Sequence, residues 1–221
     1  MKSKTLLIAA ASLAAGVMAA SAAVYSQNIV GYVNFTLTNG LNCVANPLDL
    51  DGTGTNNTVY TCVGTYLPNV SKIIAFSGGN YTSSAFNKAA GTWNSAAGVT
   101  FALQPGKGFF IYIPPSATYP QTVTMVGQVL TGGLTNNLIA GIQLVGSQIP
   151  VAGGLDTNLG FQPASLDRYL PWNPNIQNYG TGQAYNGGSH VWTGGEPQIA
   201  VGQGFYLTAH ATSVWTNSFN P

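Results

Sequence analysis

Short apolar runs separated by turn residues make up most of the chain after residue 23, and this pattern predicts strands. Phe109–Ile113 is an aromatic and β-branched run, and Lys72–Phe76 is another run of similar length. Such residues favour the pleated surface of a sheet. No later segment repeats apolar residues at i, i+3 and i+4, so helix is expected only as a short piece within Thr58–Tyr66.

Turn residues mark where these strands reverse direction. The segment Ser77–Asn80 holds two glycines between Phe76 and Tyr81, and glycine and asparagine tolerate the positive φ of tight hairpin turns. The segment Asn173–Asn175 holds the corresponding place later in the chain. The chain contains 28 glycines and 12 prolines, spread every few residues. The sequence therefore predicts an all-β fold.

One strand motif occurs twice, which indicates an internal duplication. Gly106–Ile113 has the sequence GKGFFIYI, and Gly202–Ala209 has GQGFYLTA at an offset of 96 residues (202 minus 106). Further matches follow in the same order at nearly this offset: Ile29–Gly31 with Met125–Gly127, Asn42–Ala45 with Asn137–Ala140, Lys72 with Arg168, Phe76 with Trp172, Trp93 with Trp192, and Tyr119 with Trp215. The chain is predicted to hold two tandem, pseudo-equivalent β-sandwich or barrel-like repeats, at 23–124 and 125–221.

The first residues have the layout of a signal peptide. Lys2 and Lys4 precede an apolar stretch that ends in a small-x-small pattern at Ala20–Ala22. Residues 1–22 are therefore expected to be removed on export, with cleavage after Ala22, or else after Ala23. The expected location is the medium, the cell surface or the periplasm, and the mature chain contains no transmembrane stretch.

Export places the two cysteines in an oxidising compartment. Cys43 and Cys62 are the only cysteines of the chain. Two thiols in a secreted protein predict one disulfide, and the alternative is two small buried side chains that never meet.

Charged residues are scarce, and this limits the function. The chain has six Lys or Arg and five Asp or Glu among 221 residues, whereas charged residues make up about a quarter of an average domain. Six cations cannot form the basic surface that nucleic-acid binding needs. Removal of Lys2 and Lys4 leaves a formal charge of four minus five, or −1. Such low charge gives little repulsion between copies, so the protein itself is an expected partner.

One loop has the composition of a calcium site. Asp49 and Asp51 alternate before a glycine turn, and Asn56 follows with a further oxygen. Hard cations such as Ca²⁺ select oxygen ligands of this kind. The loop lacks a third carboxylate, so the alternative is a plain turn built from Asp, Gly and Asn.

Aromatic residues next to amides predict a surface for glycans. Trp172, Tyr179, Tyr185 and Trp192 lie in a segment rich in Asn and Gln. Aromatic faces stack on sugar rings, and amides bind hydroxyls. Aromatic positions in both repeats are equally consistent with packing.

Catalytic residues are few. Hydrolysis would need His190 together with an acid such as Asp167, or a carboxylate pair drawn from Asp156, Asp167 and Glu196. Asp167 is adjacent to Arg168, which predicts a local ion pair instead. The expectation is therefore a protein that is not an enzyme.

Three motifs resemble those of the uncharacterised exported β-repeat proteins of Verrucomicrobia-like bacteria. They are the opening segment Tyr25–Tyr32, the strand Asn42–Ala45 with its copy Asn137–Ala140, and the strand Pro105–Phe110. The second copy of the last motif, Val201–Tyr206, departs at the proline and at the final aromatic residue. The resemblance implies export and a β architecture, and it implies no activity.

These observations favour an exported, non-enzymatic structural or interaction module of the cell surface or extracellular matrix. Self-association follows as a corollary. The alternative is a carbohydrate-binding protein that uses the aromatic residues of the second repeat, with surface glycans as partners. A secreted hydrolase is the third hypothesis.

Overall fold

The chain folds into antiparallel β-sheets, which confirms the predicted all-β class. The structure, a computed structural model, describes residues 29–94, 102–118 and 120–220. The expected signal peptide at 1–22 and Tyr119 lie outside these ranges. The only helix in the described ranges is α2 (Val59–Cys62), inside the segment where a short helix is expected. Thr58 and Thr61 cap α2 with reciprocal hydrogen bonds between side chains and backbone N–H groups.

The first half of the molecule, residues 29–129, contains a five-stranded sheet in the order β2-β7-β4-β5-β6. Strands β1, β8 and β3 form a second sheet. The strands of this half are β1 (Val30–Leu37), β2 (Gly40–Ala45), β3 (Leu48–Asp49), β4 (Lys72–Ser77), β5 (Asn80–Asn87), β6 (Thr92–Trp93), β7 (Gly108–Ile113) and β8 (Gln121–Val129).

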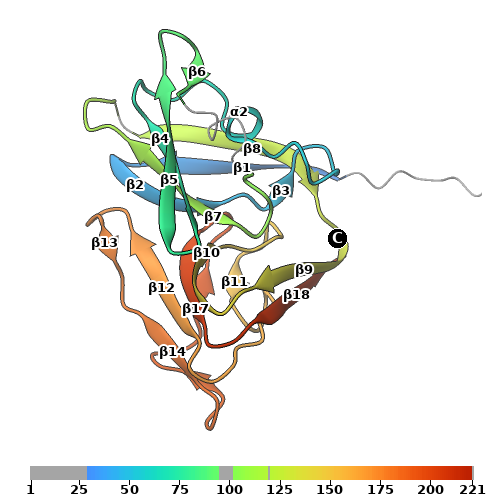
Figure 1. Cartoon of the computed structure of the whole chain (residues 1–221). Helices are drawn as coiled ribbons and strands as arrows, with labels where there is room; N and C mark the ends of the chain where they lie inside the picture. The colour runs from blue at the N-terminus through green and yellow to red at the C-terminus, as the bar shows by residue number, and fades with distance from the viewer. Residues whose placement is uncertain (1–28, 95–101, 119, 221) are drawn as a thin grey trace, which may run out of the picture.

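The second half, residues 132–220, contains a sheet in the order β10-β17-β12-β14-β15, with β13 paired to β12. Strands β9 and β18 form a ribbon, and β11 pairs with β16. The strands are β9 (Gly132–Leu138), β10 (Gly141–Val145), β11 (Gly153–Gly154), β12 (Arg168–Asn173), β13 (Asn178–Tyr179), β14 (Gln183–Asn186), β15 (Val191–Trp192), β16 (Gln198–Ile199), β17 (Phe205–Ala209) and β18 (Ser213–Phe219). Figure 1 shows the first half in blue to yellow-green above the second half in yellow to red.

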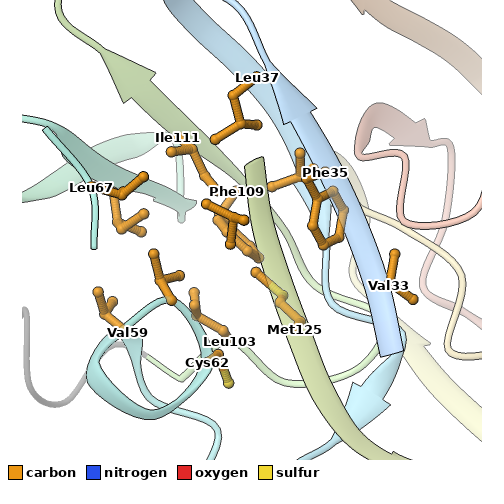
Figure 2. Close-up of a cluster of buried hydrophobic side chains, with 14 of the residues drawn as sticks. Val33, Phe35, Leu37, Val59, Cys62, Leu67, Leu103, Phe109, Ile111 and Met125 are labelled. Atoms are coloured by element: carbon orange, nitrogen blue, oxygen red, sulfur yellow. The ribbon is translucent and has the colours of Figure 1, made fainter. Parts of the chain in front are cut away.

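Each half has its own apolar core between its small sheet and its large sheet. We call the two small sheets, β1-β8-β3 and β9-β18, the outer ribbons. In the first half, alternate residues of β1 point inward (Val33, Phe35 and Leu37), as expected for a strand with one buried face. They meet Phe109 and Ile111 of β7 (Figure 2). In the second half, Phe205 and Leu207 of β17 pack with Trp215 of β18 in the same way.

A third apolar cluster lies between the two large sheets. Phe110 of β7, Leu144 of β10 and Tyr206 of β17 form its buried centre. Because neighbouring residues of a strand point to opposite faces, Phe109 enters the core of the first half and Phe110 enters this cluster. We call the surface around this cluster the inter-sheet interface. The molecule therefore has four layers, with the ribbons outside and the two large sheets inside.

The expected boundary at 124/125 falls inside β8. This strand pairs with β1 along its length, so Gly31 lies opposite Gly127 in one ribbon. The expected match of Ile29–Gly31 with Met125–Gly127 sets β1 on β8, but Gly31 and Gly127 are partners in one ribbon, and by its place before β10 it is β9 that corresponds to β1. Alternation of apolar residues is similar in both strands, which explains the false match.

The predicted match of Asn42 with Asn137 is also shifted. Asn42 accepts a hydrogen bond from Thr38 N and donates one to Thr38 O. Gln143 makes the same two bonds with Ile139. By its place in the sheet, Gln143 is the counterpart of Asn42.

Candidate functional site

Backbone contacts join the two halves in a reciprocal pattern. Ala45 N, at the end of β2, donates a hydrogen bond to Gly202 O at 2.7 Å. Gly146 N, just after β10, donates to Gly106 O at 3.2 Å. β-Bridges also join Val44 to Gln203, and Lys107 to Val145. Each half therefore extends an edge strand of the other half at the GKG or GQG motif.

Two glycines of these motifs permit the close approach. A Cβ atom on Gly108 would lie 2.8 Å from Val145 O, and one on Gly204 would lie 2.5 Å from Val44 O. Both contacts are with backbone atoms, which cannot move aside. The glycine-rich motif is thus an element of the inter-sheet interface.

Aromatic rings cross the interface in matched pairs. Phe110 of β7 lies edge-on to Trp172 of β12 at 5.3 Å between ring centroids. Tyr206 of β17 lies edge-on to Phe76 of β4 at 5.6 Å. The Tyr206 hydroxyl is also 2.5 Å from the Tyr81 hydroxyl. Burial raises the pKa of Tyr206, and the neighbouring hydroxyl of Tyr81 raises it further.

A cleft of about 290 Å³ opens at one end of this interface. The β4–β5 turn, with Phe76, Ser77 and Gly78, forms one wall. The turn between β9 and β10 and the start of β10, with Ile139 and Ile142, form the facing wall. Lys107 lies at the cleft as an exposed cation. The volume is near the lower end of the range for small-ligand sites.

The four aromatic residues expected to bind glycans lie in two separate pairs. Trp172 and Tyr179 are opposite each other on β12 and β13, at the inter-sheet interface. Tyr185 and Trp192 are opposite each other on β14 and β15 and pack against the core of the second half. Trp192 is only 4% exposed, and its indole N–H donates to Asp156. Of the four, Tyr179 has an exposed side chain, at 42%.

The predicted disulfide between Cys43 and Cys62 is wrong. Both thiols are free. Cys43 belongs to the inter-sheet cluster, whereas Cys62 of α2 belongs to the core of the first half. The β2 backbone separates these two environments, because Cys43 and Val44 point to opposite faces. Burial raises the pKa of the Cys43 thiol, and burial also raises the pKa of Cys62 to about 11.

The expected calcium ligands lie close together in the chain, and the chain itself binds the carboxylate oxygens of Asp49 and Asp51. Asp49 accepts hydrogen bonds from Gly54 N at 2.9 Å and from Asn57 Nδ2 at 2.9 Å. Asp51 accepts from the backbone and hydroxyl of Thr53 and from the amide of Asn56. These bonds lower the pKa of Asp51, the bond from the Thr53 side chain most of all. Among the described residues, no group of three or more His, Cys, Asp or Glu side chains could hold a metal ion.

The carboxylate of Asp167, expected as the acid of a hydrolase, accepts hydrogen bonds from backbone N–H groups instead. Asp167 is buried and accepts hydrogen bonds from Ala164 N at 2.8 Å and His210 N at 2.7 Å. These bonds replace the expected ion pair with Arg168. His190 lies in the turn between β14 and β15, with φ of 54°.

Two other acidic residues, Asp156 and Glu196, are joined through the backbone. Glu196 accepts hydrogen bonds from Asp156 N and Thr157 N, both at 2.7 Å. Burial raises the pKa of Glu196, but these bonds outweigh burial, and the net pKa is lowered. Burial raises the pKa of Asp156, and the charge of Glu196 adds to this rise against a hydrogen bond from Trp192. The pair holds the turn Leu155–Leu159 in place.

The sequence did not indicate the cleft. It also did not indicate the residue that fills the equivalent position at the opposite end of the inter-sheet interface. That residue is Gln177, whose side chain bonds to the backbone of Asn39 and Leu41. A signal was present in the lengths of the hairpin turns. Two residues, Gly78 and Gly79, join β4 to β5, but four residues, 174–177, join β12 to β13.

No family model, no curated protein and no solved structure matches this chain. No helix among the described residues is long and apolar enough to span a membrane.

Proposed function

We propose that the protein is an exported, non-enzymatic interaction module built from a duplicated β unit. The observation that carries this proposal is an exposed apolar patch on the outer ribbon of the first half. Tyr32 and Val126 lie opposite each other on β1 and β8, and Val30 is next to them on the same face. Their side chains are 72%, 52% and 68% exposed. Apolar side chains grouped on one face are typical of contact surfaces.

The rest of the proposal draws on the equivalent order of strands in the two large sheets and on the signal-like residues 1–22. The patch lies beside the outer edge of β1, which has unpaired backbone groups. A second copy of the chain is the partner that such an edge and patch favour. The formal charge near zero adds little repulsion between copies.

Sedimentation velocity of the mature protein over a wide concentration range tests this function. We expect concentration-dependent association that Tyr32→Ser with Val126→Ser weakens. Tyr66→Ser is the matched control, since Tyr66 is 90% exposed and lies outside the patch. A strict monomer at every concentration, or equal effects of the patch and control variants, would contradict self-association. Fractionation of the producing cells tests export.

Carbohydrate binding is a second candidate, favoured by two exposed tyrosines near one another. Tyr81 and Tyr179 both lie next to Tyr206 at the rim of the inter-sheet interface. Retention on immobilised polysaccharides that Tyr81→Ala and Tyr179→Ala abolish would support this candidate. Retention unchanged in both variants, or none by the wild type, would reject it.

A further inference from the structure

The inter-sheet interface has two ends, and the chain closes one of them with Gln177. The Gln177 side-chain oxygen accepts a hydrogen bond from Leu41 N at 2.6 Å. Its amide nitrogen donates to Asn39 O at 3.1 Å and to Leu41 O at 3.2 Å. Leu41 lies on β2, at the edge of the first sheet. One carboxamide group therefore binds the outward backbone groups of an edge strand.

The other end has the same arrangement without the glutamine. Ile142 holds the place of Leu41, since each follows a glycine of positive φ and lies on an edge strand. Ile142 pairs with Thr208 of β17, as Leu41 pairs with Tyr112 of β7. Gln143 and Asn42, the next residues, make matching bonds, as described above.

The length of the hairpin turn explains why this end is open. Two glycines join β4 to β5, so this turn carries no glutamine in the place of Gln177. The cleft lining does include the amide side chains of Gln104, Asn137 and Gln143, of which Gln104 and Gln143 bond to other groups. Phe76 occupies the place of Trp172, whose indole N–H also bonds to Leu41 O at 2.8 Å. In the described part of the chain, no side chain makes a hydrogen bond to the Ile142 backbone. The cleft is the space that results.

We propose that this cleft binds a carboxamide group, carried by a glutamine or asparagine side chain of an extended peptide. The amide oxygen accepts from Ile142 N, and the amide nitrogen donates to Ile142 O and Ala140 O. A carboxylate would bring its negative charge against two carbonyl oxygens and has no hydrogen to donate. Ile139, 56% exposed, and Phe76 give apolar walls for the rest of the peptide. The cleft continues the inter-sheet interface, where the same chemistry already joins the two halves.

Titration of the ¹⁵N-labelled protein with acetyl-Gly-Gln-Gly-N-methylamide tests the proposal. We expect saturable shifts of the amide signals of Gly141 and Ile142, and no such shifts when leucine replaces glutamine in the peptide. The peptide with glutamate in that place should bind roughly tenfold to hundredfold more weakly, which corresponds to the loss of the two hydrogen bonds that the amide nitrogen donates. Replacing Gly78 and Gly79 by the four-residue turn 174–177 should fill the cleft and abolish binding.

The variant Gln177→Ala provides a second test, because it removes the side chain that closes the other end of the inter-sheet interface. This variant should gain a second peptide site, seen as shifts at Leu41, while the site at Ile142 stays unchanged. Ile176→Ala is the control, since Ile176 is exposed in the same turn and makes none of these bonds. Absence of shifts at Ile142 in the wild type, or of a second site in Gln177→Ala, would overturn the proposal. Tighter binding of the glutamate peptide that Lys107→Gln abolishes would show an anion site instead.

Discussion

At the scale of single residues, close backbone approach decides where the two halves meet. Gly108 and Gly204 stand where any Cβ would collide with a carbonyl oxygen of the other half. The duplicated GxG motif is visible in the sequence, but nothing next to it in the chain requires its second glycine. The reason for the second glycine lies in the other half of the chain, so a local pattern could not indicate it.

Gly204→Ala should destabilise the protein by about 1–3 kcal/mol, because the new methyl group must push the β2 backbone away. Gly133→Ala is the control, since its Cβ would meet nothing within 4 Å. We expect the control to change the free energy of unfolding by less than about 1 kcal/mol. Urea titration of both variants gives the comparison, and equal stability of the two would contradict the close contact.

The two free thiols predict slow chemical labelling of the folded protein. A thiol whose pKa is raised holds little of the reactive thiolate form at neutral pH. Burial raises the pKa of Cys43, and Cys62 has a pKa of about 11. Mass spectrometry after iodoacetamide treatment should find both cysteines unmodified in the native state and modified in urea without reductant. A chain that resists labelling even in urea would contain the disulfide.

Buried tyrosines predict a loss of stability at alkaline pH. Burial raises the pKa of Tyr169 from 10.0 to about 12, despite a hydrogen bond from Gln203, and Tyr206 is also raised. Groups with a raised pKa in the folded state contribute stability below the unfolded value, and this contribution falls as pH rises through the folded value. The free energy of unfolding should therefore fall between pH 10 and 12. Tyr206→Phe should make this fall shallower, and an identical fall would contradict the assignment.

At the scale of elements, the strand motif was correctly predicted, but its two faces were not. The run of apolar residues in β7 and β17 indicates strands buried on both sides. Phe109 faces one core and Phe110 faces the inter-sheet interface, so each strand belongs to two clusters. The same ambiguity affects Trp172 and Trp192, which the sequence places in one aromatic segment. Pairing of β12 with β13 and of β14 with β15 sends them to different clusters.

The β12–β13 hairpin should lose stability when its contact with β2 is weakened. Trp172→Phe keeps an aromatic ring but removes the N–H group that bonds to Leu41 O. The expected cost is about 0.5–1.5 kcal/mol, the net value of one hydrogen bond. Tyr185→Phe is the control, because its hydroxyl makes no hydrogen bond among the described residues. Thermal unfolding followed by tryptophan fluorescence compares the stability of the two variants. Equal losses of stability would contradict a contribution from the hydrogen bond between Trp172 and Leu41 O.

At the scale of the whole molecule, the inter-sheet interface makes the two halves interdependent. Its centre is apolar, and its edges are bridged by reciprocal backbone bonds at Ala45 and Gly146. Separation would expose this apolar surface and leave the backbone groups of two edge strands unpaired. The all-β class and the pair of related strand motifs followed from the sequence. The face-to-face packing did not, because it depends on which side of each strand a partner occupies.

The most direct test of this account is cleavage of the chain between the halves. A protease site inserted between Leu130 and Thr131, in the short connection of β8 to β9, allows the folded protein to be cut without removing any strand. Size-exclusion chromatography of the cut protein should give one peak that contains both fragments, which separate only in denaturant. Two folded fragments that elute separately under native conditions would contradict the interface on which the account depends.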